Sequence, residues 1–252
     1  MKETITFIGN GNMALSIAQG LKDIFDIEVV GRQIEKLEKF EKNLGVKIKK
    51  EIYEDFDMTD KKVILCVKPA NLQEVGLRLK GVADELYSVL AGASISSLKE
   101  NIKAKSIVRV MPNLAASVGK SMTTMTGDGT LRKEAEELFK AIGKTVWLSS
   151  EKEVDIATAV AGSGPAYLAL IHEALCDGAV KQGMKRTDAI EVTNGLFSGF
   201  GDLIQTIHPA ILKDGVMSPG GTTAAGYAAL ERGNVRNSCI NAIEDAYMVT
   251  QK

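Results

Sequence analysis

Six residues close to the N-terminus have the spacing of a phosphate-binding loop. Residues 9–14 read Gly-Asn-Gly-Asn-Met-Ala, a G-x-G-x-x-A pattern that directly follows an apolar run. In this pattern the first glycine permits a tight turn, the second lets a pyrophosphate approach the backbone, and the small sixth residue lets helix and strand pack closely. N–H groups at the start of the next helix then face the phosphates. The pattern predicts a dinucleotide site formed by Gly9, Asn10, Gly11, Asn12 and Met13. A plain turn between a strand and a helix is the alternative.

The end of the second apolar strand indicates which dinucleotide is preferred. An Asp or Glu at this place usually binds a ribose 2′-hydroxyl, whereas an arginine accommodates a 2′-phosphate. Here residues 27–30 are followed by Gly31 and Arg32, without a carboxylate. The sequence therefore predicts NADPH as the cofactor, with NADH as the weaker choice, and Arg32 as the residue that pairs with the 2′-phosphate. The alternative is a solvated surface arginine.

Three later strand ends carry small or polar residues that suit the same site. Carboxyl ends of parallel strands meet at one edge of a sheet, where open α/β folds bind ligands. A proline there turns the chain away from the sheet, an alanine leaves room, and an asparagine offers an amide to the nicotinamide. Each residue alone is more often part of an ordinary loop, but three strand ends that converge on one edge favour a ligand site. The candidates for cofactor binding are Val67, Lys68, Pro69, Ala91 and Asn113.

A second glycine-rich loop lies in the last part of the chain. Residues 218–223 read Ser-Pro-Gly-Gly-Thr-Thr and lead directly into a helical pattern that ends near Arg232. Backbone N–H groups at such a helix start form an anion cradle. A small carboxylate would fit there, with added hydroxyl donors from Thr222 and Thr223. The alternative is a helix that is merely capped by Ser or Thr.

The elements that must position these residues change in kind near residue 149. Before it, apolar strands alternate with amphipathic helices, which is typical of βαβ units around a mostly parallel sheet. Strands are expected at 4–8, 27–30, 62–67, 86–91, 106–110 and 145–148, with 121–126 as an edge strand. After it, helices are expected at 166–184, 187–207, 223–232 and from residue 234 onward. The sequence therefore predicts an α/β Rossmann domain over residues 1–149 and an all-α domain over residues 150–252.

Composition excludes several classes of protein. The 252 residues are 45% hydrophobic and 25% charged, as in an ordinary globular protein. A net charge of −1 provides no basic field for nucleic acid or an anionic membrane. The three cysteines are widely spaced, and neither histidine has metal-ligand spacing, so a reducing compartment and no metal are expected. No run approaches ~18 uninterrupted apolar residues, and the N-terminus lacks the features of a signal peptide. We therefore expect a cytoplasmic protein without a nucleic-acid or membrane partner.

Two segments of the helical half resemble the hallmark segments of pyrroline-5-carboxylate reductases. They are residues 161–167, Ala-Gly-Ser-Gly-Pro-Ala-Tyr, and the glycine-rich run 218–223. Segments 7–14, 67–69, 91–92 and 109–113 are also similar and occur in the same order. The resemblance covers nearly the whole chain. It implies a Rossmann domain followed by a helical dimerisation domain. It also implies reduction of 1-pyrroline-5-carboxylate to L-proline by NADPH or NADH, with hydride transfer to an imine carbon.

The resemblance also implies roles for individual residues. Thr223 would be the catalytic residue and would contact the ring nitrogen of the substrate. Glu151 matches an acidic position on the substrate side. The substrate carboxylate would be held by Ser218, Gly220, Gly221 and Thr222.

The chain departs from the family pattern at three places. Leu114 and Ala115 follow Asn113 where the family often has Thr-Pro, and Gln205 stands where many members have Glu. Ile52 lies near a position where some members have an Asn that holds the nucleotide. These departures concern the finer cofactor and substrate contacts.

Small residues in the helical half favour self-association. Gly195 and Gly199 are four positions apart in one predicted helix. Small residues let the backbones of two helices approach closely. We therefore expect a homodimer or a higher homo-oligomer; the alternative is packing against the Rossmann domain alone.

Two other functions fit parts of the pattern. A β-hydroxyacid dehydrogenase would place a catalytic Lys beside residues 162–164, but the next lysine downstream is Lys181. A non-catalytic NADPH sensor would not need the cradle at 218–223. Turnover with pyrroline-5-carboxylate, compared with 3-hydroxy acids, separates these functions.

Overall fold

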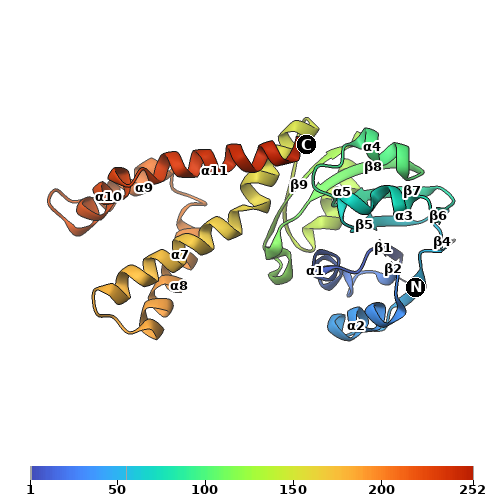
Figure 1. Cartoon of the computed structure of the whole chain (residues 1–252), viewed down its shortest axis with the longest axis horizontal. Helices are drawn as coiled ribbons and strands as arrows, with labels where there is room; N and C mark the ends of the chain where they lie inside the picture. The colour runs from blue at the N-terminus through green and yellow to red at the C-terminus, as the bar shows by residue number, and fades with distance from the viewer. Residues whose placement is uncertain (1, 55, 252) are drawn as a thin grey trace. The chain divides into compact units, whose positions relative to one another are not determined.

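The chain forms two compact units in the computed structural model, which describes residues 2–54 and 56–251. The first unit contains Met1–Ser163 and Ala246–Lys252, and the second contains Gly164–Asp245. All described strands belong to the first unit, and the second is helical (Figure 1). The predicted order, an α/β domain followed by an all-α domain, is confirmed.

An eight-stranded sheet forms the centre of the first unit. Its strand order is β10-β9-β8-β7-β5-β1-β2-β3, and every neighbouring pair is parallel except β8 and β9. The strands are β1 (Thr4–Ile8), β2 (Asp26–Gly31), β3 (Lys49–Ile52), β5 (Lys62–Leu65), β7 (Ala83–Ser88), β8 (Ala104–Met111), β9 (Ser121–Gly127) and β10 (Gly143–Trp147). Strands β4 (Phe56–Asp57) and β6 (Leu79–Lys80) pair separately. The expectation that 121–126 is an edge strand is wrong, because β10 adds beyond β9.

Helices cover both faces of this sheet, since its side chains fall into two buried clusters. One cluster joins the sheet to α1 (Asn12–Leu21), α2 (Ile34–Leu44) and α5 (Arg132–Lys140). The other joins it to α3 (Leu72–Gly76) and α4 (Ile95–Asn101). Short 3-10 turns occupy Pro69–Asn71, Leu114–Val118 and Gly129–Leu131. Strands β1 and β5 are buried from both sides, which explains their largely apolar sequences.

The second unit has almost no core of its own. It contains α7 (Gly164–Lys181), α8 (Arg186–Leu203), α9 (Pro209–Gly215), α10 (Thr222–Arg232) and the first part of α11 (Val235–Thr250). Helices α7 and α8 lie side by side (Figure 1). Within this unit only Cys176, Ala189 and Thr193 are buried. Large apolar side chains such as Leu170, Leu196 and Ile240 are more than half exposed.

The segment that connects the last strand to the helical unit belongs to the first unit. Helix α6 (Glu151–Ala157) continues into one π-helical turn at Thr158–Gly162, where the Ser163 amide donates to the Thr158 carbonyl. Asp155 of α6 pairs with Arg109 of β8 at 2.6 Å. A grouping of contacts does not fix where an independent folding domain ends. The boundary between residues 149 and 150 therefore stays a prediction.

One stretch of helix is long and apolar enough to cross a membrane, judged by length and composition among the described residues. It is Glu151–Lys181, with a mean hydropathy of 1.4 over its most apolar window and 11% of that window buried. A long apolar helix that packs against a protein partner passes the same test.

The end of the chain returns to the first unit. Residues from Ala246 onward belong to it. A Cβ atom added to Gly92, in the loop after β7, would lie 3.7 Å from the Thr250 carbonyl oxygen. The last turn of α11 is therefore in van der Waals reach of that loop.

Candidate active site

The first glycine of the predicted phosphate loop is required by its surroundings. Gly9 has φ +110°, and a Cβ there would lie 2.6 Å from the Cys66 carbonyl oxygen. Its amide donates to the Val30 carbonyl at 2.9 Å. The turn is therefore wedged between the ends of β2 and β5, and no other residue type fits without a backbone shift.

The second glycine leaves room for a ligand. A Cβ on Gly11 would meet no atom within 4 Å, and its φ of −78° is open to any residue. Gly11 is the N-cap of α1, and no side chain caps that helix. The first N–H groups of a helix have no partner within the helix. Since α1 begins at the carboxyl edge of the sheet, its start fits the pyrophosphate of a dinucleotide.

The other predicted cofactor residues gather at the same edge. Arg32 is exposed directly after β2. Lys68 is exposed after β5, and Pro69 begins the following 3-10 turn. Ala91 is exposed after β7, and Val67 is half-buried. Because β2, β1, β5 and β7 are consecutive in the sheet, their carboxyl ends form one continuous rim beside the phosphate loop.

Asn113 is at this rim, but the protein itself uses its side chain. Its Oδ1 accepts from the Ala115 amide at 3.1 Å, and its Nδ2 donates to the Ala161 carbonyl at 2.9 Å. Asn113 thus holds the π-helical turn to the end of β8. Each carboxamide nitrogen has two hydrogens, so one donor remains for the predicted contact with nicotinamide.

Glu151 is likewise held by protein groups. Its Oε1 accepts from the Ile95 amide at 2.7 Å and pairs with Arg109 Nη1 at 3.1 Å. Arg109 is 2% exposed and also binds Asp155. The sequence analysis gave no role to Arg109 or Asp155. No local pattern could have revealed their pairing, since the two residues are 46 positions apart.

The second glycine-rich loop leads into the start of α10, within the helical unit. Gly220 has φ +71°, and the Gly221 amide donates to the Ser218 carbonyl at 3.0 Å. Gly221 is the N-cap of α10, and no side chain caps it. Thr222 and Thr223 occupy the first two helical positions and are exposed. The alternative that Thr223 is an N-cap is therefore wrong, because that place belongs to a glycine.

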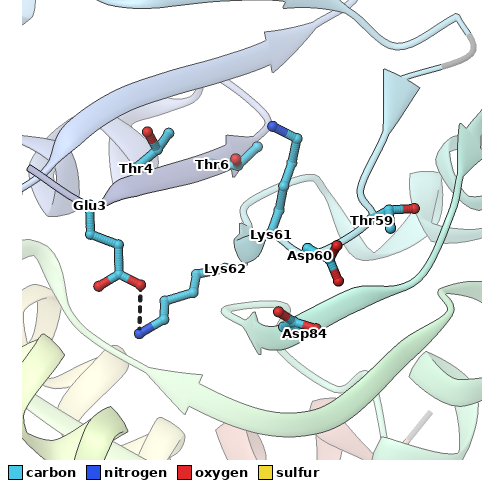
Figure 2. Close-up of a pocket in the computed structure, with 8 residues that line it drawn as sticks. All are labelled: Glu3, Thr4, Thr6, Thr59, Asp60, Lys61, Lys62 and Asp84. Atoms are coloured by element: carbon cyan, nitrogen blue, oxygen red, sulfur yellow. Dashed lines mark ion pairs between the residues drawn. The ribbon is translucent and has the colours of Figure 1, made fainter. Parts of the chain in front are cut away.

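A cavity of about 310 Å³ opens at the opposite, amino-terminal edge of the sheet (Figure 2). Both lysines of its lining are in ion pairs: Lys62 binds Glu3 of the lining at 3.0 Å, and Lys61 binds the buried Glu28 outside it at 2.9 Å. Burial opposes ionisation of Glu28, but hydrogen bonds from Lys49, Thr6 and Lys61 outweigh it and lower its pKa. Ligands of open α/β folds bind at the other edge, so this cavity is not the candidate site.

Reactive side chains are scarce at the cofactor edge. Burial raises the pKa of the Cys66 thiol, which keeps it protonated and unreactive. The described residues contain no group of three His, Cys, Asp or Glu side chains that could hold a metal ion. The cofactor edge therefore offers a glycine-rich loop and a guanidinium, and the start of α10 in the other unit offers threonine hydroxyls.

Several known proteins that are similar to this chain over most of its length are named pyrroline-5-carboxylate reductases. Sequence models of the pyrroline-5-carboxylate reductase dimerisation domain and of F420-dependent NADP oxidoreductases match residues 151–252 and 4–90. A pyrroline-5-carboxylate reductase from Pisum sativum is 35% identical over 254 residues, 95% of this chain and 92% of that protein. The solved reductase from Streptococcus pyogenes is 30% identical, with a TM-score of 0.86 over 98% of this chain and 97% of that one. The reductase from Plasmodium falciparum, solved with NADP bound, is 26% identical, with a TM-score of 0.79 over 98% of both chains.

Proposed function

The chain belongs to the pyrroline-5-carboxylate reductase family, and we propose that it reduces 1-pyrroline-5-carboxylate to L-proline with NADPH. The observation that carries this proposal is the uncapped start of α10, where Gly221 leaves backbone N–H groups free beside two exposed threonines. That arrangement suits a small carboxylate. Similarity over nearly the full length of the relatives supports an enzyme of the same kind.

The carboxyl edge of the sheet fits NADPH. Gly9 cannot carry a Cβ, Gly11 has space around it, and α1 begins without a capping side chain. We assign the pyrophosphate to Gly9, Asn10, Gly11, Asn12 and Met13, the 2′-phosphate to Arg32, and the nicotinamide half to Val67, Lys68, Pro69, Ala91 and Asn113. NADPH, when bound, supplies the hydride.

The substrate residues are assigned to the start of α10. Free N–H groups and the positive helix end attract the carboxylate, and the Thr222 hydroxyl adds a donor. Ser218, Gly220 and Gly221 shape the turn that exposes those groups. Glu151 can face the substrate through its Oε2, because both of its contacts use Oε1 and its side chain is 37% exposed.

Reduction of an imine requires little from side chains. A protonated iminium is already electrophilic, so holding its carbon in place supplies most of the rate enhancement. We assign Thr223 to a hydrogen bond with the ring nitrogen, which fixes its position and can carry its proton. General acid assistance of this kind contributes ~10²–10⁴-fold at most.

The helical unit serves self-association. The dimerisation model covers residues 151–252, which supports both a homo-oligomer and the proposed domain boundary between residues 149 and 150. A second chain would cover the exposed apolar side chains of α7 and α8, including those of Glu151–Lys181. We therefore propose a soluble cytoplasmic homodimer without a membrane partner.

Oxidation of NADPH, followed by absorbance, tests this function. The purified chain should oxidise NADPH with 1-pyrroline-5-carboxylate and form proline, and it should be inactive with 3-hydroxy acids and NADP. Turnover of 3-hydroxy acids would favour the β-hydroxyacid dehydrogenase. NADPH binding without turnover of either substrate class would favour the sensor.

A further inference from the structure

Tyr53 lies beside the residue that selects the cofactor. It directly follows β3, and its amide donates to the Gly31 carbonyl at 3.1 Å. Since Gly31 is the last residue of β2, this bond fixes Tyr53 next to Arg32 across the two strand ends. The residue is 4% exposed.

The ring of Tyr53 is part of the core beneath the cofactor edge. Its buried cluster also contains Ile8, Val30 and Leu65. These three residues lie at the carboxyl ends of β1, β2 and β5. Each is followed within two positions by a residue that we assign to NADPH. A rigid ring in this layer holds its hydroxyl in one place.

The Tyr53 hydroxyl makes no hydrogen bond within residues 2–54 and 56–251, and it is not among the fully buried unpaired atoms there. Its oxygen therefore reaches the surface, where a ligand can meet it. The buried Tyr87, by contrast, donates to Glu85 at 2.6 Å. The charged or ionisable groups that act on the Tyr53 phenol are Arg32 directly after β2, Cys66 directly after β5, and Glu74 of α3. Burial raises the pKa of Tyr53 to about 12, so the phenol keeps its proton at neutral pH and can donate it.

We propose that the Tyr53 hydroxyl donates a hydrogen bond to the 2′-phosphate of NADPH, on the same group that pairs with Arg32. A phosphate dianion offers only acceptors, which a protonated phenol satisfies. Hydrogen bonds to charged acceptors are stronger than those to neutral ones, so the contact favours NADPH over NADH. The inference rests on the proposed function only in its choice of NADPH.

Tyr53→Phe tests the proposal, because it keeps the ring and removes only the hydroxyl. We expect affinity for NADPH and for adenosine 2′,5′-bisphosphate to fall about tenfold, measured by calorimetry. Affinity for NADH and adenosine 5′-monophosphate should change less than about twofold. Tyr87→Phe is the matched control and should leave all four affinities unchanged. Equal weakening of all four ligands by Tyr53→Phe would overturn the proposal, and so would no weakening of any.

A measurement on the unaltered protein keeps the test valid if the variant does not fold. With tyrosine labelled at Cζ, the Tyr53 resonance should shift with adenosine 2′,5′-bisphosphate and not with adenosine 5′-monophosphate. No difference between the two ligands would contradict the contact. Both experiments measure binding without turnover, so absence of pyrroline-5-carboxylate reduction would refute the proposed function and leave this inference standing.

Discussion

Thr223 is exposed in the first turn of α10, where we propose that its hydroxyl binds the substrate. Thr223→Ala removes the hydroxyl and leaves the N–H groups of α10 in place. Loss of a hydrogen bond to a charged group should lower kcat/KM about 10- to 160-fold. Thr223→Ser keeps a hydroxyl and should recover most of this loss. Steady-state kinetics on both variants checks the prediction, and unchanged kinetics in Thr223→Ala would remove Thr223 from the catalytic machinery.

Stability should distinguish this role from a structural one. Because Gly221 is the N-cap of α10, Thr223→Ala removes no cap. Its melting temperature should therefore stay close to that of the unaltered protein. A clear drop in melting temperature together with normal turnover would identify a purely structural threonine.

Arg32 is the second residue whose role can be isolated. Arg32→Ala should raise KM for NADPH about tenfold or more, because the 2′-phosphate loses a charged partner. KM for NADH should barely change, since its ribose carries no phosphate. Kinetics with both cofactors at saturating substrate checks this. If both constants rise together, Arg32 contacts a part common to the two cofactors.

At the residue scale, the backbone of the two glycine-rich loops could be predicted from neighbouring residues. Each loop leads into a helix whose N-cap is a glycine, and the ligands assigned to the loops stay predictions. Asn113 and Glu151 show the limit: their contacts with Ala161 and Arg109 join residues 48 and 42 positions apart. Sequence spacing indicates that such polar groups exist, but tertiary packing decides which partner each one binds.

The turn between β1 and α1 allows a matched pair of glycine substitutions. Gly9→Ala should destabilise the protein by about 3 kcal/mol or more, because its Cβ meets the Cys66 carbonyl at a positive φ. Gly11→Ala meets nothing within the chain and should keep normal stability. It should nevertheless weaken NADPH binding, since the added methyl occupies ligand space. Urea unfolding and NADPH titration check the pair, and equal stability of the two variants would contradict it.

Strands with an apolar or β-branched pattern could be predicted from the sequence. Strand β1 has the expected bounds, β5 ends two residues earlier than expected, and β7 lies three residues earlier than expected. Strand β3 reads Lys-Lys-Glu-Ile and pairs with β2 at the sheet edge, so it carries almost no apolar signal. In the π-helical turn at Thr158–Gly162, an amide bonds to the carbonyl five residues earlier, whereas in an α-helix it bonds to the carbonyl four residues earlier. Amino-acid composition does not reveal this difference.

The whole molecule should depend on a second copy for its stability. The helical unit buries only Cys176, Ala189 and Thr193, too little to offset the loss of conformational entropy on folding. Light scattering at micromolar concentration should give at least twice the mass of one chain. The melting temperature should rise with protein concentration, because association stabilises the folded state by mass action.

A charged substitution on the exposed face of α8 tests the same dependence on a partner. Leu196 is 57% exposed on α8, beside Gly195. Leu196→Glu should lower the melting temperature and shift the protein towards monomers. A fully stable monomer at micromolar concentration, in the unaltered chain, would refute the dependence on a partner.

The position of the last turn of α11 affects how the protein is made and handled. Ribosomes release the sheet of the first unit long before Thr250, yet that residue lies beside the Gly92 loop at the rim assigned to the cofactor. A nascent chain arrested before α11 would therefore carry a complete set of strands and an incomplete rim. For the same reason, we expect a purification tag at the N-terminus to disturb this rim less than one at the C-terminus, because a C-terminal tag would follow shortly after Thr250.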